Sequence, residues 1–190
     1  KALDSMVRRE YDFECPVRPL SSDLGCLELF HGPTFAFKDF GARFMGGMSG
    51  LLNDGRETLT VLVATSGDTG SAVAAGFHNV PGINVVVLYP KGKVSPLQEA
   101  QMTTLGHNIF PLRVSGCFDD CQRLVKELFA DVEFRSRVRI TSANSINVLR
   151  WIPQSFYYFY GYCQWRRSHS GAPDIVVPSG NYGNITAGML

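Results

Sequence analysis

The chain has 190 residues, of which 45% are hydrophobic and 18% are charged. This is the composition of a globular protein with one substantial core, or with one domain and part of a second. The formal net charge of +1 gives no electrostatic reason to expect nucleic acid or an acidic membrane surface as a partner. No apolar run approaches the roughly 20 residues of a membrane-spanning helix, and the N-terminus lacks the pattern of a secretory signal.

In chain order, short apolar runs rich in β-branched residues alternate with segments of helical spacing. The runs at 59–64, 83–89 and 174–178 are continuously apolar, which is typical of strands covered on both faces. Alternation of this kind predicts a three-layer α/β fold, with helices on both faces of a parallel sheet. The predicted elements are helices at 37–48, 73–77, 97–105, 124–128, 152–163 and 184–190, and strands at 59–64, 83–89, 109–114, 138–141 and 174–178.

The five cysteines are an odd number in a chain long enough to have a core. They favour reduced thiols and a cytoplasmic location over a framework of disulfides. Cys117 and Cys121 are four residues apart, but no histidine or second cysteine pair completes a metal site. Their spacing fits one face of a helix, so we expect core packing there and no bound metal.

Two glycine-rich turns follow apolar strands and open helices, at 65–70 and 178–184. Such a turn can expose unpaired backbone N–H groups at the positive end of a helix dipole, an arrangement that binds phosphate or carboxylate. Neither turn has the spacing of a P-loop or of a dinucleotide-binding motif. Each turn alone could be a tight connection without a ligand, but two of them suggest two anionic groups held near one site.

Lys38 follows the turn at 32–34 and stands among Phe35, Phe37 and Phe40, so we expect it in the first turn of a helix. Desolvation by the aromatic rings and the positive dipole end would both favour the neutral amine and lower its pKa. A neutral lysine amine is the nucleophile that forms a Schiff base with an aldehyde. The alternative is a lysine that extends to solvent and pairs with Asp39.

Together these segments resemble the threonine synthases, which are fold-type II pyridoxal-phosphate enzymes. The resemblance runs from about residue 25 to residue 190 and rests on five motifs in order, at 29–39, 64–70, 89–95, 142–147 and 178–184. It implies conversion of O-phospho-L-homoserine and water to L-threonine and phosphate, with pyridoxal 5′-phosphate as the cofactor.

The resemblance also implies roles for the matching residues. Lys38 would hold the cofactor covalently and move protons at the substrate. Asp68 would lie beside the 3′-oxygen of the cofactor, where many relatives carry asparagine; an ionised carboxylate cannot donate a hydrogen bond there. The cofactor phosphate would lie in the loop formed by Ser179, Gly180, Asn181, Tyr182, Gly183 and Asn184.

The substrate would occupy two further groups of residues. Its α-carboxylate would be received by Thr65, Ser66, Gly67, Thr69 and Gly70. Its phosphate suits charged donors, and the candidates are Ser145, Asn147, Arg150, Lys91 and Lys93. The alternatives are helix capping for Ser145 and Asn147, and a basic surface turn for the two lysines.

By the same resemblance, residues 1–40 would be the N-terminal part of a larger domain and would include Lys38. Residues 41–165 would form a small α/β domain, and residues 166–190 would begin the C-terminal part of the larger one. The chain starts without Met and stops inside a predicted helix, so we expect an internal part of a longer protein that lacks the C-terminal part. Fold-type II relatives commonly dimerise, so self-association is a further expectation.

Two other functions remain open. One is a threonine-synthase-like phospholyase that acts on the same substrate and releases 2-oxobutyrate. The other is a non-catalytic α/β module that binds phosphate or a nucleotide, with Lys38 in a structural role.

Overall fold

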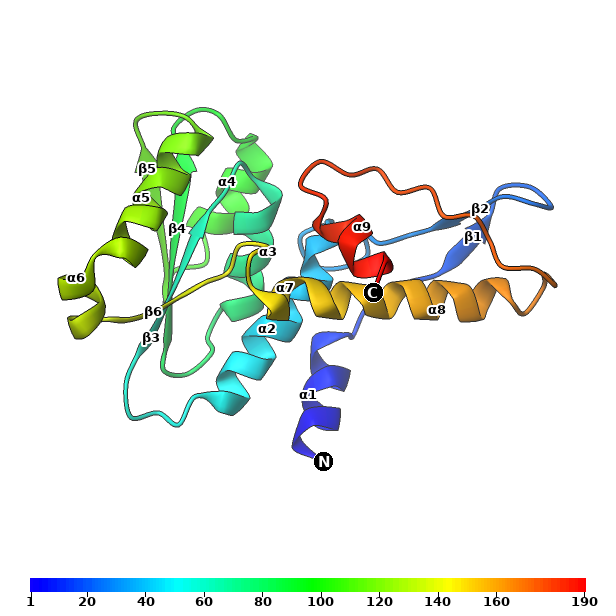
Figure 1. Ribbon diagram of the computed structural model, residues 1–190, viewed down its shortest axis with the longest axis horizontal. Coiled ribbons are helices and arrows are strands. Elements are labelled where there is room, and N and C mark those ends of the chain that lie inside the picture. Colours follow the sequence, from blue (N-terminus) through cyan, green and yellow to red (C-terminus); the bar gives the residue numbers. More distant parts are fainter.

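The computed structural model describes residues 1–190 as a four-stranded sheet between helices, with an elongated second part beside it (Figure 1). None of the helices combines the length and the apolar character that crossing a membrane requires. The strands are β1 (Val17–Pro19), β2 (Gly25–Leu27), β3 (Leu59–Ala64), β4 (Ile83–Pro90), β5 (Ile109–Val114) and β6 (Arg139–Ser142). The helices are α1 (Ala2–Glu10), α2 (Lys38–Leu52), α3 (Asp68–Phe77), α4 (Pro96–Thr103), α5 (Phe118–Ala130), α6 (Val132–Arg137), α7 (Val148–Trp151), α8 (Ser155–Trp165) and α9 (Gly183–Gly188).

The main sheet is parallel throughout, in the order β5–β4–β3–β6. Its strands were predicted correctly: β3 and β5 have the expected bounds, while β4 and β6 differ by one residue. Parallel neighbours need crossover connections, which α3, α4 and the pair α5–α6 supply. The chain moves outward from β3 to β5 and then returns to place β6 on the other side of β3, so the order reverses at β3.

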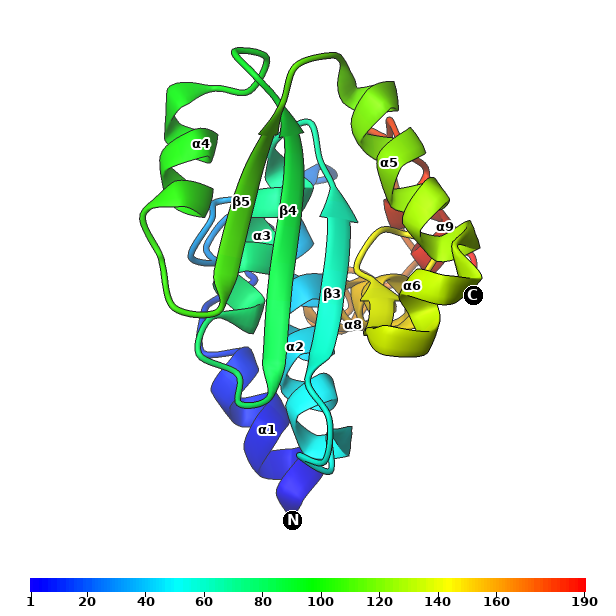
Figure 2. The ribbon, with the colours of Figure 1, turned by 90° about the vertical axis from the view of Figure 1, so that its left-hand side faces the viewer.

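Helices cover both faces of this sheet, as the alternating pattern predicts. One face packs against α2, α3 and α4 in a core that includes Val61, Val63 and Val85, all fully buried. The other face packs against α5 through Leu62 and Leu88. Figure 2 shows α5 on one side of the strands and α3 and α4 on the other. Alternate residues of β3 therefore serve two different cores, which explains why this strand is continuously apolar.

Helices α2 and α3 are in unusually close contact because glycines face each other. A Cβ atom built on Gly46 would lie 2.0 Å from the carbonyl oxygen of Gly76, and one built on Gly76 would lie 2.8 Å from the backbone of Ala42. No side chain larger than hydrogen fits at either position. This close packing fixes α2, and with it the position of Lys38, against the sheet domain.

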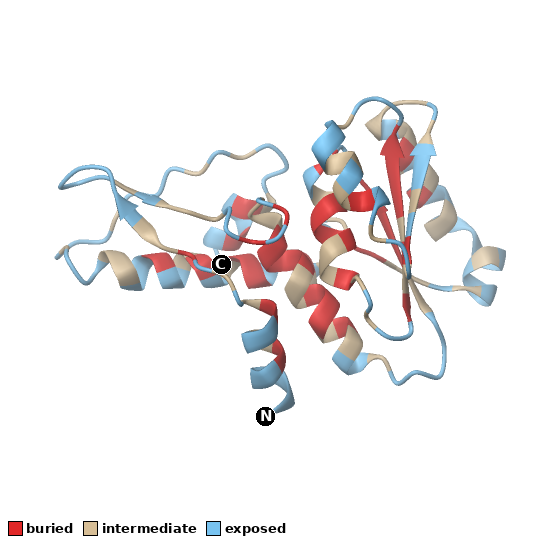
Figure 3. Ribbon diagram, turned by 180° about the vertical axis from the view of Figure 1, so that it is seen from behind, coloured by how far each residue is buried: buried red, intermediate tan, exposed pale blue.

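The second part of the molecule consists of α8, the β1–β2 hairpin and α9, which lie together away from the sheet (Figure 1). The side chain of Gln164 on α8 accepts a 3.0 Å hydrogen bond from the N–H of Val17 and donates a 2.8 Å hydrogen bond to the carbonyl of Cys15. Figure 3 shows that buried residues concentrate in the sheet and in the helices packed on it. Helix α8 begins after a 3₁₀ turn at Ile152–Gln154, so Pro153 lies at the helix start as its missing N–H predicts.

The strand predicted at 174–178 is wrong. These residues form no strand, and the side chains of Ile175 and Val176 are 57% and 93% exposed. A strand requires neighbours that pair with its backbone groups, and none of the strands pairs with this segment. Its apolar sequence is therefore not sufficient to form the element.

Candidate active site

A cavity of about 370 Å³ opens at the carboxyl ends of β3 and β6. This is the point where the order of the sheet reverses, and ligands of open parallel sheets bind at such switch points. The residues after β3 form one wall and those after β6 form a second. Lys38 at the start of α2 and the segment 178–184 complete it.

The structure brings most of the residues singled out in the sequence to this cavity. Those that line it are Lys38, Thr65, Ser66, Asp68, Thr69, Ser145, Arg150, Ser179, Gly180, Asn181, Tyr182, Gly183 and Asn184. Those that do not are Gly67, Gly70, Asn147, Lys91 and Lys93. The two lysines are exposed in the turn after β4, which agrees with the alternative of a basic surface turn.

Lys38 is the first residue of α2, as expected. Burial lowers the pKa of its amine, and the nearby positive charge of Arg150 lowers it further, while the negative charge of Asp68 opposes both effects. The Nζ atom lies 4.8 Å from the centre of the Phe37 ring. Phe35, in contrast, is 68% exposed, so it does not desolvate the amine in the way the sequence suggested. The lowered pKa of Lys38 therefore comes from burial and from Arg150.

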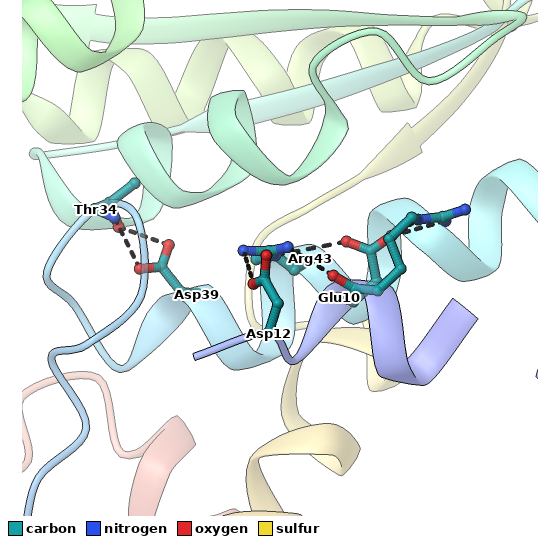
Figure 4. A network of polar contacts seen from close by, with 6 residues as sticks. Glu10, Asp12, Thr34, Asp39 and Arg43 are labelled. Atoms are coloured by element: carbon teal, nitrogen blue, oxygen red, sulfur yellow. Dashed lines mark hydrogen bonds and ion pairs between the residues drawn. The ribbon is translucent and has the colours of Figure 1, made fainter. Parts of the chain in front are cut away.

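Asp39 does not pair with Lys38 but fixes the turn that precedes it (Figure 4). Its fully buried carboxylate accepts a 2.9 Å hydrogen bond from the N–H of Thr34 and a 2.7 Å hydrogen bond from the Thr34 hydroxyl. Between them, Phe35 adopts a left-handed conformation with φ of 61°, which is uncommon for a residue with a side chain. The two hydrogen bonds hold this turn against the first turn of α2, directly beside Lys38.

The turn from Thr65 to Gly70 is organised by the hydroxyl of Thr65, which is 1% exposed. Its Oγ1 accepts hydrogen bonds from the N–H groups of Gly67 at 2.9 Å and Gly70 at 2.8 Å. The N–H groups of Gly67 and Gly70, which we expected to be available for an anion, are therefore hydrogen-bonded within the protein. Ser66, Asp68 and Thr69 remain as the side chains of this turn that face the cavity together with Thr65.

After β6, two asparagines organise the second wall. The side chain of Asn144 continues the parallel ladder, since its Nδ2 donates to the carbonyl of Ala64 at 2.8 Å and its Oδ1 accepts from the N–H of Ala64 at 3.2 Å. Asn147 caps α7 by accepting from the N–H of Leu149 at 3.0 Å, and it donates to the carbonyl of Ser142. Asn147 therefore has the capping role that was its alternative interpretation.

Arg150 places a buried positive charge in the wall of the cavity. It is 3% exposed, and its Nη1 donates to the carbonyl of Ala143 at 3.0 Å. Its Nε atom is buried without a hydrogen-bond partner. Burial lowers the pKa of Arg150 to about 10, and the negative charge of Asp39 opposes this shift. A buried guanidinium with a free donor is a strong site for an anion.

The segment 178–184 forms the remaining wall and leads into α9. Tyr182 has a left-handed conformation with φ of 57°, and the Oγ atom of Ser179 is buried without a partner. Asn184 is held in place from α8, because its Oδ1 accepts hydrogen bonds from Tyr157 at 2.6 Å and from Tyr158 at 2.8 Å.

The sequence analysis missed other residues of the cavity. Gln98 projects from α4, and Phe118 and Gln122 from α5. Gln98 stands three residues after Ser95 in the pattern of a capping box, which could have revealed the start of α4 beside the turn at 91–95. Phe118 and Gln122 are one helical turn apart, and their helix follows the carboxyl end of a strand, which places both at the same edge of the sheet.

Comparison with known proteins shows which proteins this chain is similar to. A family model described as "Pyridoxal-phosphate dependent enzyme" matches residues 16–190. The chain is 50% identical to the threonine synthase of Escherichia coli over 188 residues, and 49% identical to that of Buchnera aphidicola over 185 residues. A crystal structure of threonine synthase from Brucella melitensis with bound pyridoxal phosphate matches with a TM-score of 0.85 and 40% identity.

These matches cover almost the whole of this chain but less than half of each relative. They include 99% and 97% of the chain for the E. coli and Buchnera proteins, against 44% and 43% of those proteins. For the Brucella structure the values are 99% and 42%. The chain thus spans well under half the length of the curated relatives it matches.

Proposed function

The chain belongs to the family of pyridoxal-phosphate-dependent enzymes, and on that premise we propose that its cavity is part of the active site of a threonine synthase. The reaction would convert O-phospho-L-homoserine and water to L-threonine and phosphate. The observation that carries the proposal is the meeting of Lys38 and the segment 179–184 in one cavity at the switch point of the sheet.

The residues of the cavity fit the cofactor. Lys38 has an amine whose pKa is lowered by burial and by Arg150, as a residue that bonds to an aldehyde requires. The Ser179 hydroxyl is buried without a partner, and it belongs to the loop that would hold the cofactor phosphate. When bound, the cofactor would supply an electron sink for the substrate's α-carbon.

The proposed roles of the chain's own residues follow from their positions. Lys38, freed when the substrate binds, would accept the proton of the α-carbon, for which a neutral amine is needed. Ser66 and Thr69 would orient the α-carboxylate. Ser145 and the buried guanidinium of Arg150 would hold the substrate phosphate, because both line the cavity and the Nε of Arg150 has no internal partner.

Water must enter only at the last step, so the sheet domain would close over the remaining part of the molecule. The division into parts at residues 40 and 165 belongs to this proposal. The contacts of α8 with β1 and α9 favour moving the second boundary to the start of α8. A cytoplasmic location is a further part of the proposal, supported by the odd number of cysteines in a chain long enough to have a core.

The test of the reaction uses the full-length protein with O-phospho-L-homoserine and identifies the organic product. Threonine supports the proposal. Release of 2-oxobutyrate without threonine would instead identify a phospholyase, and no turnover together with no cofactor would identify a non-catalytic module.

A second test asks whether Lys38 bonds covalently to the cofactor. Borohydride should remove the visible absorption band of the full-length protein and leave the label on Lys38. Lys38→Ala should abolish both the band and turnover. Lys126→Ala is the matched control, because Lys126 is exposed on α5 and should change neither. If Lys38→Ala kept the band and full turnover, the proposal would be wrong.

A further inference from the structure

The side chain of Gln98 connects the start of α4 to the start of α3, beside the cavity. It is the third residue of α4, and its side chain lies over the turn that opens α3. Its Nε2 donates a hydrogen bond to Oδ1 of Asp68. Its Oε1 accepts from the N–H of Ser95 at 3.3 Å and from the Ser95 hydroxyl at 3.0 Å. The side chain therefore joins the start of α4 to the start of α3.

The orientation of the Gln98 amide follows from chemistry. The backbone N–H of Ser95 can only donate a hydrogen bond, so the group that faces it must be the oxygen of the amide. The nitrogen is then the group that faces Asp68, and it can only donate. A carboxylate at position 68 accepts this bond without rearrangement.

The capping box alone does not explain a glutamine here. Glutamate at the same position accepts from the N-cap N–H equally well, and either residue completes the box. The feature that glutamine adds is the amide nitrogen, and the group that this nitrogen contacts is Asp68.

The close approach of Gln98 also explains Gly67. A Cβ atom on Gly67 would lie 2.4 Å from Oε1 of Gln98, and the backbone there has φ of 148°. Gly67 does not line the cavity, and its backbone conformation and the approach of Gln98 both favour glycine there.

The charged groups that line the cavity are Lys38 from α2, Asp68 from α3 and Arg150 from α7. Gln98 and Gln122, from α4 and α5, are neutral, and Tyr182 is the one other titratable residue of the lining. Asp68 thus supplies the one negative charge that faces the amine of Lys38, and its position decides how strongly it acts there.

We propose that Gln98 is a positioning residue that holds the Asp68 carboxylate on the α4 side of the cavity, where it faces the Lys38 amine without pairing with it. The hydrogen bond itself does not depend on the proposed function. Its consequence for catalysis rests on the proposed role of Lys38.

The test is a double-mutant cycle in the full-length protein. Gln98→Glu keeps the capping box but replaces the donor by a second carboxylate, which repels Asp68. Asp68→Asn alone still accepts from Gln98 through its amide oxygen. In the double variant, the new amide at position 68 donates to the new carboxylate at position 98, so the bond returns with its direction reversed and the total charge unchanged.

Two readouts apply to each variant without cofactor. One is the urea midpoint of unfolding. The other is the pH dependence of Lys38 labelling by formaldehyde and cyanoborohydride, read by mass spectrometry of the peptide. Gln98→Glu should lower the urea midpoint and raise the pH midpoint of labelling, because added negative charge favours the protonated amine. The double variant should restore both towards the wild-type values.

Leu97→Glu is the matched control, since it adds the same charge one residue earlier at a position that is 60% exposed. It should move the labelling midpoint less than Gln98→Glu. The proposal is overturned if Gln98→Glu and Leu97→Glu shift the labelling midpoint equally, or if Gln98→Glu changes neither midpoint. It is also overturned if the double variant remains as perturbed as Gln98→Glu alone. None of these readouts requires turnover, so failure of the proposed reaction would leave the result interpretable.

Discussion

The hydroxyl of Tyr157 donates a 2.6 Å hydrogen bond to Oδ1 of Asn184, and it thereby ties α8 to the last residue of the segment that lines the cavity. Tyr157 is 2% exposed. Burial raises the pKa of its hydroxyl, so this group is a neutral donor at neutral pH. The contact makes the position of Asn184 depend on a helix that lies outside the sheet domain.

Tyr157→Phe removes this donor and leaves Asn184 with Tyr158 alone. We expect the free energy of unfolding to fall by about 1 kcal/mol, the net contribution of one buried hydrogen bond. Affinity for pyridoxal phosphate should fall as well, since the amide of Asn184 is held less firmly. Urea unfolding and titration of the visible band measure the two effects.

Tyr160→Phe is the control for the loss of a hydroxyl from the same helix. Tyr160 is 54% exposed, so the free energy of unfolding of this variant should differ from wild type by less than about 0.5 kcal/mol. Its cofactor affinity should not change. Equal effects of the two substitutions would show that the contact with Asn184 contributes nothing specific.

Lys38→Met should stabilise the cofactor-free protein at neutral pH. Burial and Arg150 lower the pKa of this amine in the folded state, so between that pKa and the ordinary value of about 10.4 the unfolded chain binds more protons. Wild-type stability therefore rises with pH across this window. The advantage of the Met variant should be largest below the window and should shrink as the pH passes through it.

Urea unfolding of the cofactor-free full-length wild type and Met variant measures the sign of this stability difference. The pH series should run from about 7 to about 10, just below the ordinary lysine pKa. A Met variant less stable than wild type at pH 7, or a difference that grows with pH, would contradict the lowered pKa of Lys38.

Asp39→Ala should destabilise the protein by about 1–3 kcal/mol, because the buried N–H and hydroxyl of Thr34 would both lose their acceptor. Asp12→Ala is the matched control, and Asp12 is drawn in the same view (Figure 4). Asp12 pairs with Arg43 at 2.9 Å but its side chain is 64% exposed, so the loss should stay below about 1 kcal/mol. Thermal and urea unfolding compare the two variants. Equal losses would mean that the turn beside Lys38 does not depend on the Asp39 carboxylate.

Gly46→Ala should separate α2 from α3, because its Cβ would lie 2.0 Å from the carbonyl oxygen of Gly76. Overpacking of this kind costs about 1–3 kcal/mol. Gly171→Ala, where a Cβ meets no atom within 4 Å, should be close to neutral. The free energies of unfolding of both variants are compared with that of the wild type. A Gly46→Ala protein as stable as the wild type would show that α2 and α3 can move apart without loss of stability.

Much of the sheet domain could be predicted from local pattern. The bounds of β3 were correct because a continuous apolar run, ended by polar residues, marks a strand buried on both faces. The bounds of β5 were also correct, although β5 is an edge strand in which Phe110 and Leu112 are exposed. The same reasoning failed at 174–178, where Val176 is 93% exposed. The local sequence pattern indicates that a segment can form a strand, but pairing with a neighbouring strand decides whether it does.

For the site, the sequence established which chemistry was present: Lys38 at a helix start, two turns suited to anions, and Arg150 after the fourth strand of the sheet. It could not establish which donors were free, because that depends on contacts between residues distant along the chain or on side chains folding back onto a turn. The hydroxyl of Thr65 occupies two N–H groups of its own turn, and Asp39 bonds Thr34 and not Lys38. Gln98 reaches Asp68 across 30 residues because folding places α3 and α4 side by side, which no local spacing specifies.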